Sequence, residues 1–152
     1  MHRRLFCQAV IAGFWGACAQ SALGIFPSRS IRWQENLRTA HHLAVQAQRP
    51  LLIVFTATWC HYCHKLIRES LSDRALVTYI ERQFIPTLLD YDREQRIARI
   101  LEVDALPCLL VLSPQADLLI KQQGYAKSSQ VYSWLQTALQ RQQEIQMVAA
   151  QN

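Results

Sequence analysis

Residues 51–64 read LLIVFTATWCHYCH, and this stretch decides the fold. Leu51 to Thr56 form a continuous apolar, β-rich run, which predicts a strand covered on both faces. Cys60 and Cys63 follow at a spacing of three, where the strand gives way to a predicted helix. Two thiols at that spacing can form and open a disulfide without moving the backbone. The stretch therefore predicts redox chemistry on sulfur.

The two cysteines are predicted to have different roles. If a helix begins near Cys60, its unpaired N–H groups and the positive end of its dipole stabilise a thiolate on the first sulfur. Cys60 is then the nucleophile. Cys63 lies one turn along on the same helix face, so it can attack a mixed disulfide on Cys60 and release the substrate.

The first residues have the pattern of a targeting segment. Residues 1–19 combine a basic start, an apolar stretch and the small-x-small sequence Ala17-Cys18-Ala19, which predicts a cleaved signal peptide. An uncleaved anchor and lipidation at Cys18 remain alternatives. We expect a linker at 20–30, one domain at 31–140, a C-terminal tail at 141–152, and a periplasmic or otherwise exported location.

Composition agrees with one compact domain. The chain has 152 residues, of which 51% are hydrophobic, enough to bury a sizeable core. Loss of the signal peptide lowers the formal net charge from +5 to +3, because two arginines and no acid leave with it. No run of Lys or Arg indicates nucleic-acid binding, and we expect a monomer.

Hydrophobic periodicity and turn residues predict alternating helices and strands. Pro86 places its strand at a sheet edge, because proline cannot donate to a ladder on both sides. Ser128 or Ser129 is expected to cap the last helix. The expected fold is α/β, a three-layer sandwich with a four- or five-stranded mixed sheet flanked by helices. The expected elements are helices at 31–48, 60–70, 72–83, 93–101 and from 128, and strands at 51–56, 84–90, 108–112 and 117–122.

Two motifs together resemble the thioredoxin superfamily. Trp59-Cys60-x-x-Cys63 follows a buried strand, and Ala105-Leu106-Pro107 opens a later strand that runs into a hairpin. The resemblance covers about residues 31–140. Within the superfamily the chain is similar to exported thioredoxin-like thiol:disulfide oxidoreductases, such as the C-terminal domain of the transmembrane thiol reductant of the Dsb system.

The resemblance implies roles that spacing alone does not give. Pro107 would be a cis-proline against the disulfide, Leu106 would offer backbone hydrogen bonds to a client, and Trp59 would flank the substrate groove. The alternative is that Pro107 starts a strand in trans. Val54 occupies the position where relatives keep a buried acid.

Side chains around the motif are expected to adjust its redox properties. His61, Tyr62 and His64 are the predicted redox-tuning residues, since imidazole can stabilise a thiolate or carry a proton. Both histidines could instead be simply solvated. Cys108 lies where thioredoxins commonly have Thr, so it is either a small buried side chain or a third redox thiol.

The implied activity is thiol:disulfide exchange with cysteine-containing protein clients and with a thiol donor or acceptor, membrane-bound or soluble. It requires no metal and no organic cofactor. A rival interpretation is a c-type haem protein, since Cys60 to His64 also satisfies C-x-x-C-H, with Met147, His41 or His42 as second axial ligand. The same cysteines could instead bind zinc or copper, and the fold could serve as a non-catalytic binding module.

Overall fold

The computed structural model describes residues 30–151, built on a four-stranded mixed sheet. The strand order is β2-β1-β3-β4. The central β1 pairs in parallel with β2 and antiparallel with β3, which forms a hairpin with β4. The strands are β1 (Leu51–Thr56), β2 (Ile85–Asp90), β3 (Cys108–Leu112) and β4 (Leu118–Gln123). The predicted mixed sheet is confirmed. The predicted signal peptide at 1–19 and the linker up to residue 29 lie outside the described residues.

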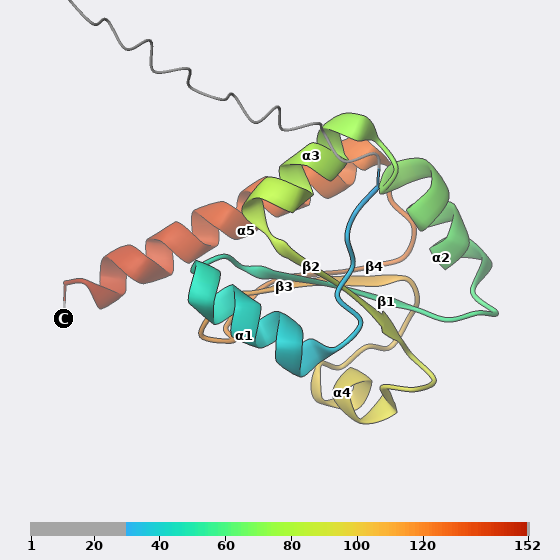
Figure 1. Ribbon diagram of the computed structural model, residues 1–152, viewed down its shortest axis with the longest axis horizontal. Helices are drawn as coiled ribbons and strands as arrows, with labels where there is room; N and C mark the ends of the chain where they lie inside the picture. Colours follow the sequence, from blue (N-terminus) through green and yellow to red (C-terminus); the bar gives the residue numbers. More distant parts are fainter. Residues whose placement is uncertain (1–29, 152) are drawn as a thin grey trace, which may run out of the picture.

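Helices cover both faces of the sheet, giving three layers (Figure 1). One face carries α1 (Leu37–Ala47) and α4 (Gln95–Ile100). The other carries α3 (Arg74–Gln83), α5 (Ser128–Ala149) and the motif helix, which consists of α2 (His61–Lys65) and the π-helical η1 (Leu66–Ser70). The predicted α/β sandwich is therefore confirmed.

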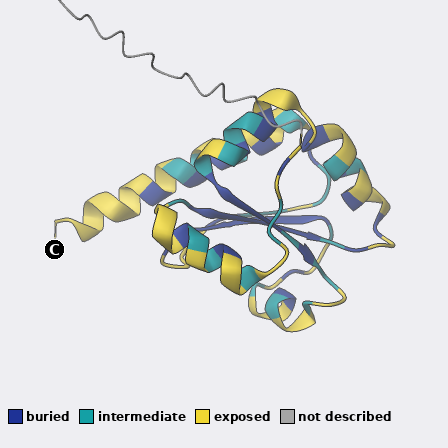
Figure 2. Cartoon of the chain, in the orientation of Figure 1, coloured by how far each residue is buried: buried dark blue, intermediate teal, exposed yellow. Residues whose placement is uncertain are grey.

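Side chains of β1 point alternately to the two faces of the sheet, so the strand contributes to both hydrophobic clusters. Leu52 and Val54 belong to the hydrophobic cluster under the motif helix and α5, while Leu51, Ile53 and Phe55 belong to the cluster under α1 and α4. Successive strand side chains point to opposite faces, so an uninterrupted apolar run contributes to both cores. Figure 2 shows β1 and β3 buried over nearly their whole length and most of the last turns of α5 exposed.

Pro86 lies in an edge strand, as predicted. Its carbonyl accepts a hydrogen bond from the Gln34 N–H at 2.8 Å, and the Leu88 N–H donates to the Gln34 carbonyl at 2.9 Å. The Pro86 nitrogen therefore lies on the outer side of β2, so the lack of an N–H there breaks no hydrogen bond between β2 and β1.

One helix start and one helix cap were predicted wrongly. The helix expected over 31–48 begins only at Leu37, because Asn36 caps it by accepting from the Thr39 N–H at 3.0 Å. The preceding residues pair with β2 through Gln34 instead. In α5 the N-cap is Lys127 rather than Ser128 or Ser129, and its N–H donates to Gln130 Oε1 at 3.0 Å.

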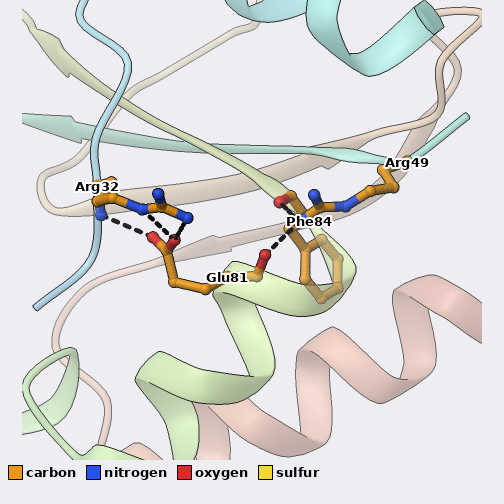
Figure 3. Close-up of polar contacts among 4 residues, drawn as sticks. All are labelled: Arg32, Arg49, Glu81 and Phe84. Atoms are coloured by element: carbon orange, nitrogen blue, oxygen red, sulfur yellow. Dashed lines mark hydrogen bonds and ion pairs between the residues drawn. The ribbon is translucent and has the colours of Figure 1, made fainter. Parts of the chain in front are cut away.

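A polar network holds the start of β1 (Figure 3). The Arg49 guanidinium donates to the backbone carbonyls of Glu81, at 2.6 Å, and of Phe84. Arg32 forms an ion pair with the Glu81 carboxylate at 2.8 Å and donates to it from its backbone N–H at 2.7 Å. Burial lowers the pKa of the Arg49 guanidinium, and this effect is larger than the opposing one of the nearby Glu81 carboxylate, which raises the pKa. The network ties three separate segments together at the end of α3.

Candidate redox site

The site forms where β1 ends and α2 begins. Ala57 is buried, and its carbonyl accepts from the Cys60 N–H at 3.1 Å, which turns the chain toward the helix. Cys60 is the N-cap of α2, and its Sγ accepts a hydrogen bond from the Cys63 N–H at 3.2 Å. The two predicted cysteines are joined by a disulfide with an S–S distance of 2.03 Å.

The surroundings of the disulfide leave one sulfur more accessible than the other. Cys60 is 6% exposed and Cys63 is 1% exposed. Two large aromatic side chains beside them are open to solvent, since Trp59 is 66% and Tyr62 is 59% exposed. Cys60 is therefore the more exposed of the two cysteines, and its sequence neighbours Trp59 and Tyr62 present aromatic surface to solvent.

Trp59 is held by a residue that the sequence analysis did not identify. Its Nε1–H donates to the Asp92 carboxylate at 2.9 Å. Asp92 lies in the loop after β2, and that loop is shaped by Asp90, whose Oδ1 accepts from the N–H groups of Asp92 at 2.9 Å and Arg93 at 3.0 Å. The sequence signal for this turn is the Asp-Tyr-Asp run directly after a strand.

Leu106 and Pro107 lie beside the cysteines. The Leu106–Pro107 peptide bond is cis in this structure. Leu106 and Tyr91 pack against the small cluster formed by Ala57 and the two cysteines. The Pro107 carbonyl accepts from the Gly124 N–H at 2.7 Å. Gly124 has φ +88°, a left-handed conformation that glycine adopts without strain.

Beneath the motif the core is apolar. Val54 is buried, pairs with Leu88 and Leu109 across the sheet, and belongs to the same hydrophobic cluster as Leu66 of the motif helix. A buried valine can neither accept nor donate a proton. Proton movement to or from Cys63 therefore cannot use this position.

The predicted tuning residues lie on the surface of α2. His61 and His64 are exposed, and the His61 ring stands edge-on to the Tyr62 ring at a centroid distance of 5.7 Å. A further polar contact on the same helix joins Lys65 and Glu69 to Tyr125. The sequence analysis did not identify these three residues, because they meet only in the folded chain.

Cys108 is a buried free thiol that lies apart from the disulfide. It faces the cluster under α1 and α4, opposite Phe55 in the antiparallel ladder. Burial raises its pKa to about 11. The thiolate is the reactive form, so this environment favours a core role over that of a third redox thiol.

Residues 30–151 contain no group of three or more His, Cys, Asp or Glu side chains that could hold a metal ion. Over the same range, no helix has both the length and the apolar character needed to cross a bilayer.

Comparison with protein families decides the identity of the fold. A model for a thioredoxin-like domain matches residues 37–139. The chain belongs to the thioredoxin-like domain family. None of the curated proteins matches its sequence.

Solved structures agree with this family. A thioredoxin from Thermus thermophilus is 23% identical, with a TM-score of 0.68 over 74% of this chain and 90% of that one. A protein described as DsbH oxidoreductase is 16% identical, with a TM-score of 0.65 over 75% and 88%. The C-terminal domain of DsbD from Neisseria meningitidis, in its oxidised form, is 16% identical, with a TM-score of 0.60 over 70% and 98%. The family and the bonded cysteine pair together identify this thioredoxin-like chain as a thiol:disulfide oxidoreductase.

Proposed function

We propose that the chain is an exported enzyme that exchanges disulfides with cysteine-containing protein clients through Cys60 and Cys63. The observation that carries the proposal is a disulfide at the start of α2 that has Leu106 packed against it and the exposed side chains of Trp59 and Tyr62 next to it in the sequence. Trp59 and Tyr62 would contact the client. Leu106 would offer its backbone N–H and carbonyl to an extended peptide.

The reaction proceeds through a mixed disulfide. In the reducing direction the Cys60 thiolate attacks one client sulfur, forms a Cys60–client disulfide and expels the other client sulfur as a thiolate. Cys63 then loses its proton, attacks Cys60 Sγ and expels the second client thiolate. The client gains two electrons and the enzyme is left with the Cys60–Cys63 disulfide. In the oxidising direction the same steps run in reverse.

Local groups would favour Cys60 as the nucleophile. The Cys63 N–H already points at Cys60 Sγ, and a donor in that position stabilises a thiolate. His61 next to it would add positive charge when protonated. With Val54 in place of an acid, the Cys63 proton would leave through solvent or through His64.

Trapping the intermediate tests the proposal. A Cys63→Ser variant cannot resolve the mixed disulfide, so a Cys60–client adduct should accumulate and appear in the intact mass with a disulfide-containing peptide. Cys60→Ser should give no adduct, while Cys108→Ala should turn over like the parent chain. Undiminished exchange by Cys60→Ser would contradict the proposal and favour a non-catalytic binding module.

The direction of electron flow is measured separately. Equilibration of the Cys60–Cys63 pair with glutathione gives its reduction potential. A value near that of thioredoxins, about −270 mV, would indicate a reductant supplied by a thiol donor, soluble or in the membrane. A much higher value would indicate an oxidase or isomerase.

Two further measurements address export and the rival chemistry. Signal cleavage should leave Gln20 near the new N-terminus, which N-terminal sequencing of the exported protein detects. Haem attachment would consume both thiols and give a Soret band, so a colourless protein with two exchangeable thiols excludes the c-type haem interpretation.

A further inference from the structure

The motif helix presents a basic flank next to the disulfide. His61, His64, Lys65 and Arg68 follow one another within eight residues, and the next residue along the chain is the acidic Glu69. Lys65 comes two residues after Cys63. The positive charge of this flank can attract an acidic client only if Glu69 does not pair with it.

Tyr125 keeps the lysine and the glutamate on separate partners. The Lys65 Nζ lies 4.7 Å from the centroid of the Tyr125 ring, a cation–π contact. The Tyr125 hydroxyl donates to Glu69 Oε2 at 3.0 Å. Among the residues that the structure describes, the one ion pair with an N–O distance of 4.0 Å or less joins Arg32 and Glu81. The Lys65 ammonium is therefore held over the ring and forms no ion pair with Glu69 within 4.0 Å.

The same contacts connect Lys65 to the Leu106–Pro107 segment. Leu106 packs against the disulfide, and the adjoining Pro107 accepts a hydrogen bond from Gly124. Tyr125 follows Gly124 directly and reaches back to Lys65 on the motif helix. These contacts link the disulfide to the Pro107 segment, the Pro107 segment to Gly124 and Tyr125, and Tyr125 to the helix that carries the cysteines.

We propose that Lys65, held over Tyr125, selects clients that carry an acidic side chain next to the reacting cysteine. The inference rests on the proposed function and adds a substrate class to it. A fixed ammonium on the helix that carries the cysteines attracts a client carboxylate and repels a client lysine. Exposed charge pairs are weak, so the expected preference is about two- to five-fold at low ionic strength. The preference lies in KM, because Lys65 does not touch the reacting sulfurs.

A pair of matched peptides tests the inference. Two cyclic disulfide peptides differ only in a Glu or a Lys beside one cysteine, and the reduced protein is assayed for kcat/KM on each. The parent chain should prefer the Glu peptide, and the preference should fall toward one in about 1 M salt. Lys65→Glu should reverse the preference. Arg82→Glu, the same charge change on the exposed end of α3, should leave it unaltered.

The outcomes separate the inference from the function on which it rests. Equal kcat/KM for both peptides in the parent chain, or equal responses to Lys65→Glu and Arg82→Glu, would overturn the inference while exchange activity stands. No exchange with either peptide would overturn the proposed function as well. If Lys65→Glu does not fold, Lys65→Met keeps the stem over the ring, and its preference should fall to about one.

Discussion

The two ends of strand β1 are held in different ways. At its start, the Arg49 guanidinium contacts two backbone carbonyls, and Arg32 pairs with Glu81 beside it (Figure 3). At its end, the chain passes into a short turn whose aromatic side chains are open to solvent. Two hydrogen bonds join this end to the loop after β2, one from the Tyr91 N–H to the Thr56 carbonyl at 2.7 Å and one from Trp59 to Asp92.

This difference separates stability from reactivity. The start of β1 fixes three segments to one another and carries no group that the proposed reaction uses. The end of β1 leads to Cys60, the proposed nucleophile, and to the exposed side chains of Trp59 and Tyr62. Substitutions at the start should therefore change the free energy of unfolding, and substitutions at the end should change exchange kinetics.

Arg49→Met should have the largest effect on stability. The change leaves the carbonyls of Glu81 and Phe84 without the guanidinium, and a buried acceptor that loses its partner costs about 1–3 kcal/mol. We expect the free energy of unfolding, measured in urea with the disulfide intact, to fall by about 2 kcal/mol. The exchange rate of the folded variant should stay within about two-fold of the parent rate, a ratio worth about 0.4 kcal/mol.

Arg32→Met is the matched control, because Arg32 belongs to the same network and its side chain is 80% exposed. An exposed ion pair contributes about 0–1 kcal/mol, so this variant should lose less than Arg49→Met. Equal losses from the two variants, or slow exchange by folded Arg49→Met, would remove the distinction between the two ends of β1.

Cys108 should make the protein less stable at alkaline pH. Its pKa is raised by burial to about 11 from an ordinary value of 9.0, so the folded state holds this proton more tightly than the unfolded state. The stabilising effect is complete below about pH 9 and is lost as pH rises through 11. We expect a loss on the order of 1–2 kcal/mol between pH 8 and 11. Cys108→Ala should lack this loss, so parallel pH curves for the two proteins would contradict the prediction.

Gln142→Leu should stabilise the protein. Gln142 is 7% exposed, and its Oε1 is among the buried side-chain atoms of the described residues that have no hydrogen-bond partner. It continues the buried stripe of α5 formed by Val131, Leu135 and Ala138. Replacing an unsatisfied polar atom with an apolar group should raise the free energy of unfolding by about 1 kcal/mol. A lower free energy of unfolding for the variant, measured in urea, would contradict the prediction and would mean that a water molecule or another group pairs with Gln142 in solution.

The parts of the fold that were predicted depend on local pattern. The run at Leu51 to Phe55 and the position of Pro86 fix β1 and the edge strand, since burial and proline chemistry act residue by residue. The helix start at Leu37 was missed because Trp33 fits helical spacing, whereas the backbone of Gln34 bonds to β2, far along the chain.

The same limit applies to the site. The cysteines are visible in sequence because their spacing and residue type carry chemistry, and the Leu106–Pro107 segment was found through the resemblance to the thioredoxin superfamily. Asp92 and Tyr125 could not be identified in this way. Asp92 lies 33 residues from its partner Trp59, and Tyr125 lies 56 residues from its partner Glu69. Contacts at such separations depend on how the layers pack, which no local pattern encodes.

Asp92→Ala should have the smallest effect and shows what the Trp59–Asp92 hydrogen bond at the end of β1 contributes. Loss of the carboxylate frees the Trp59 indole, so a client must order that side chain on binding, which costs about 0.5–1.5 kcal/mol. KM for a disulfide peptide should rise about two- to ten-fold, while kcat and the free energy of unfolding stay close to the parent values. In a Trp59→Phe background, which has no indole N–H, Asp92→Ala should have no further effect on KM. Additive effects of the two substitutions, or a fall in kcat, would mean that Asp92 acts on the sulfurs rather than through Trp59.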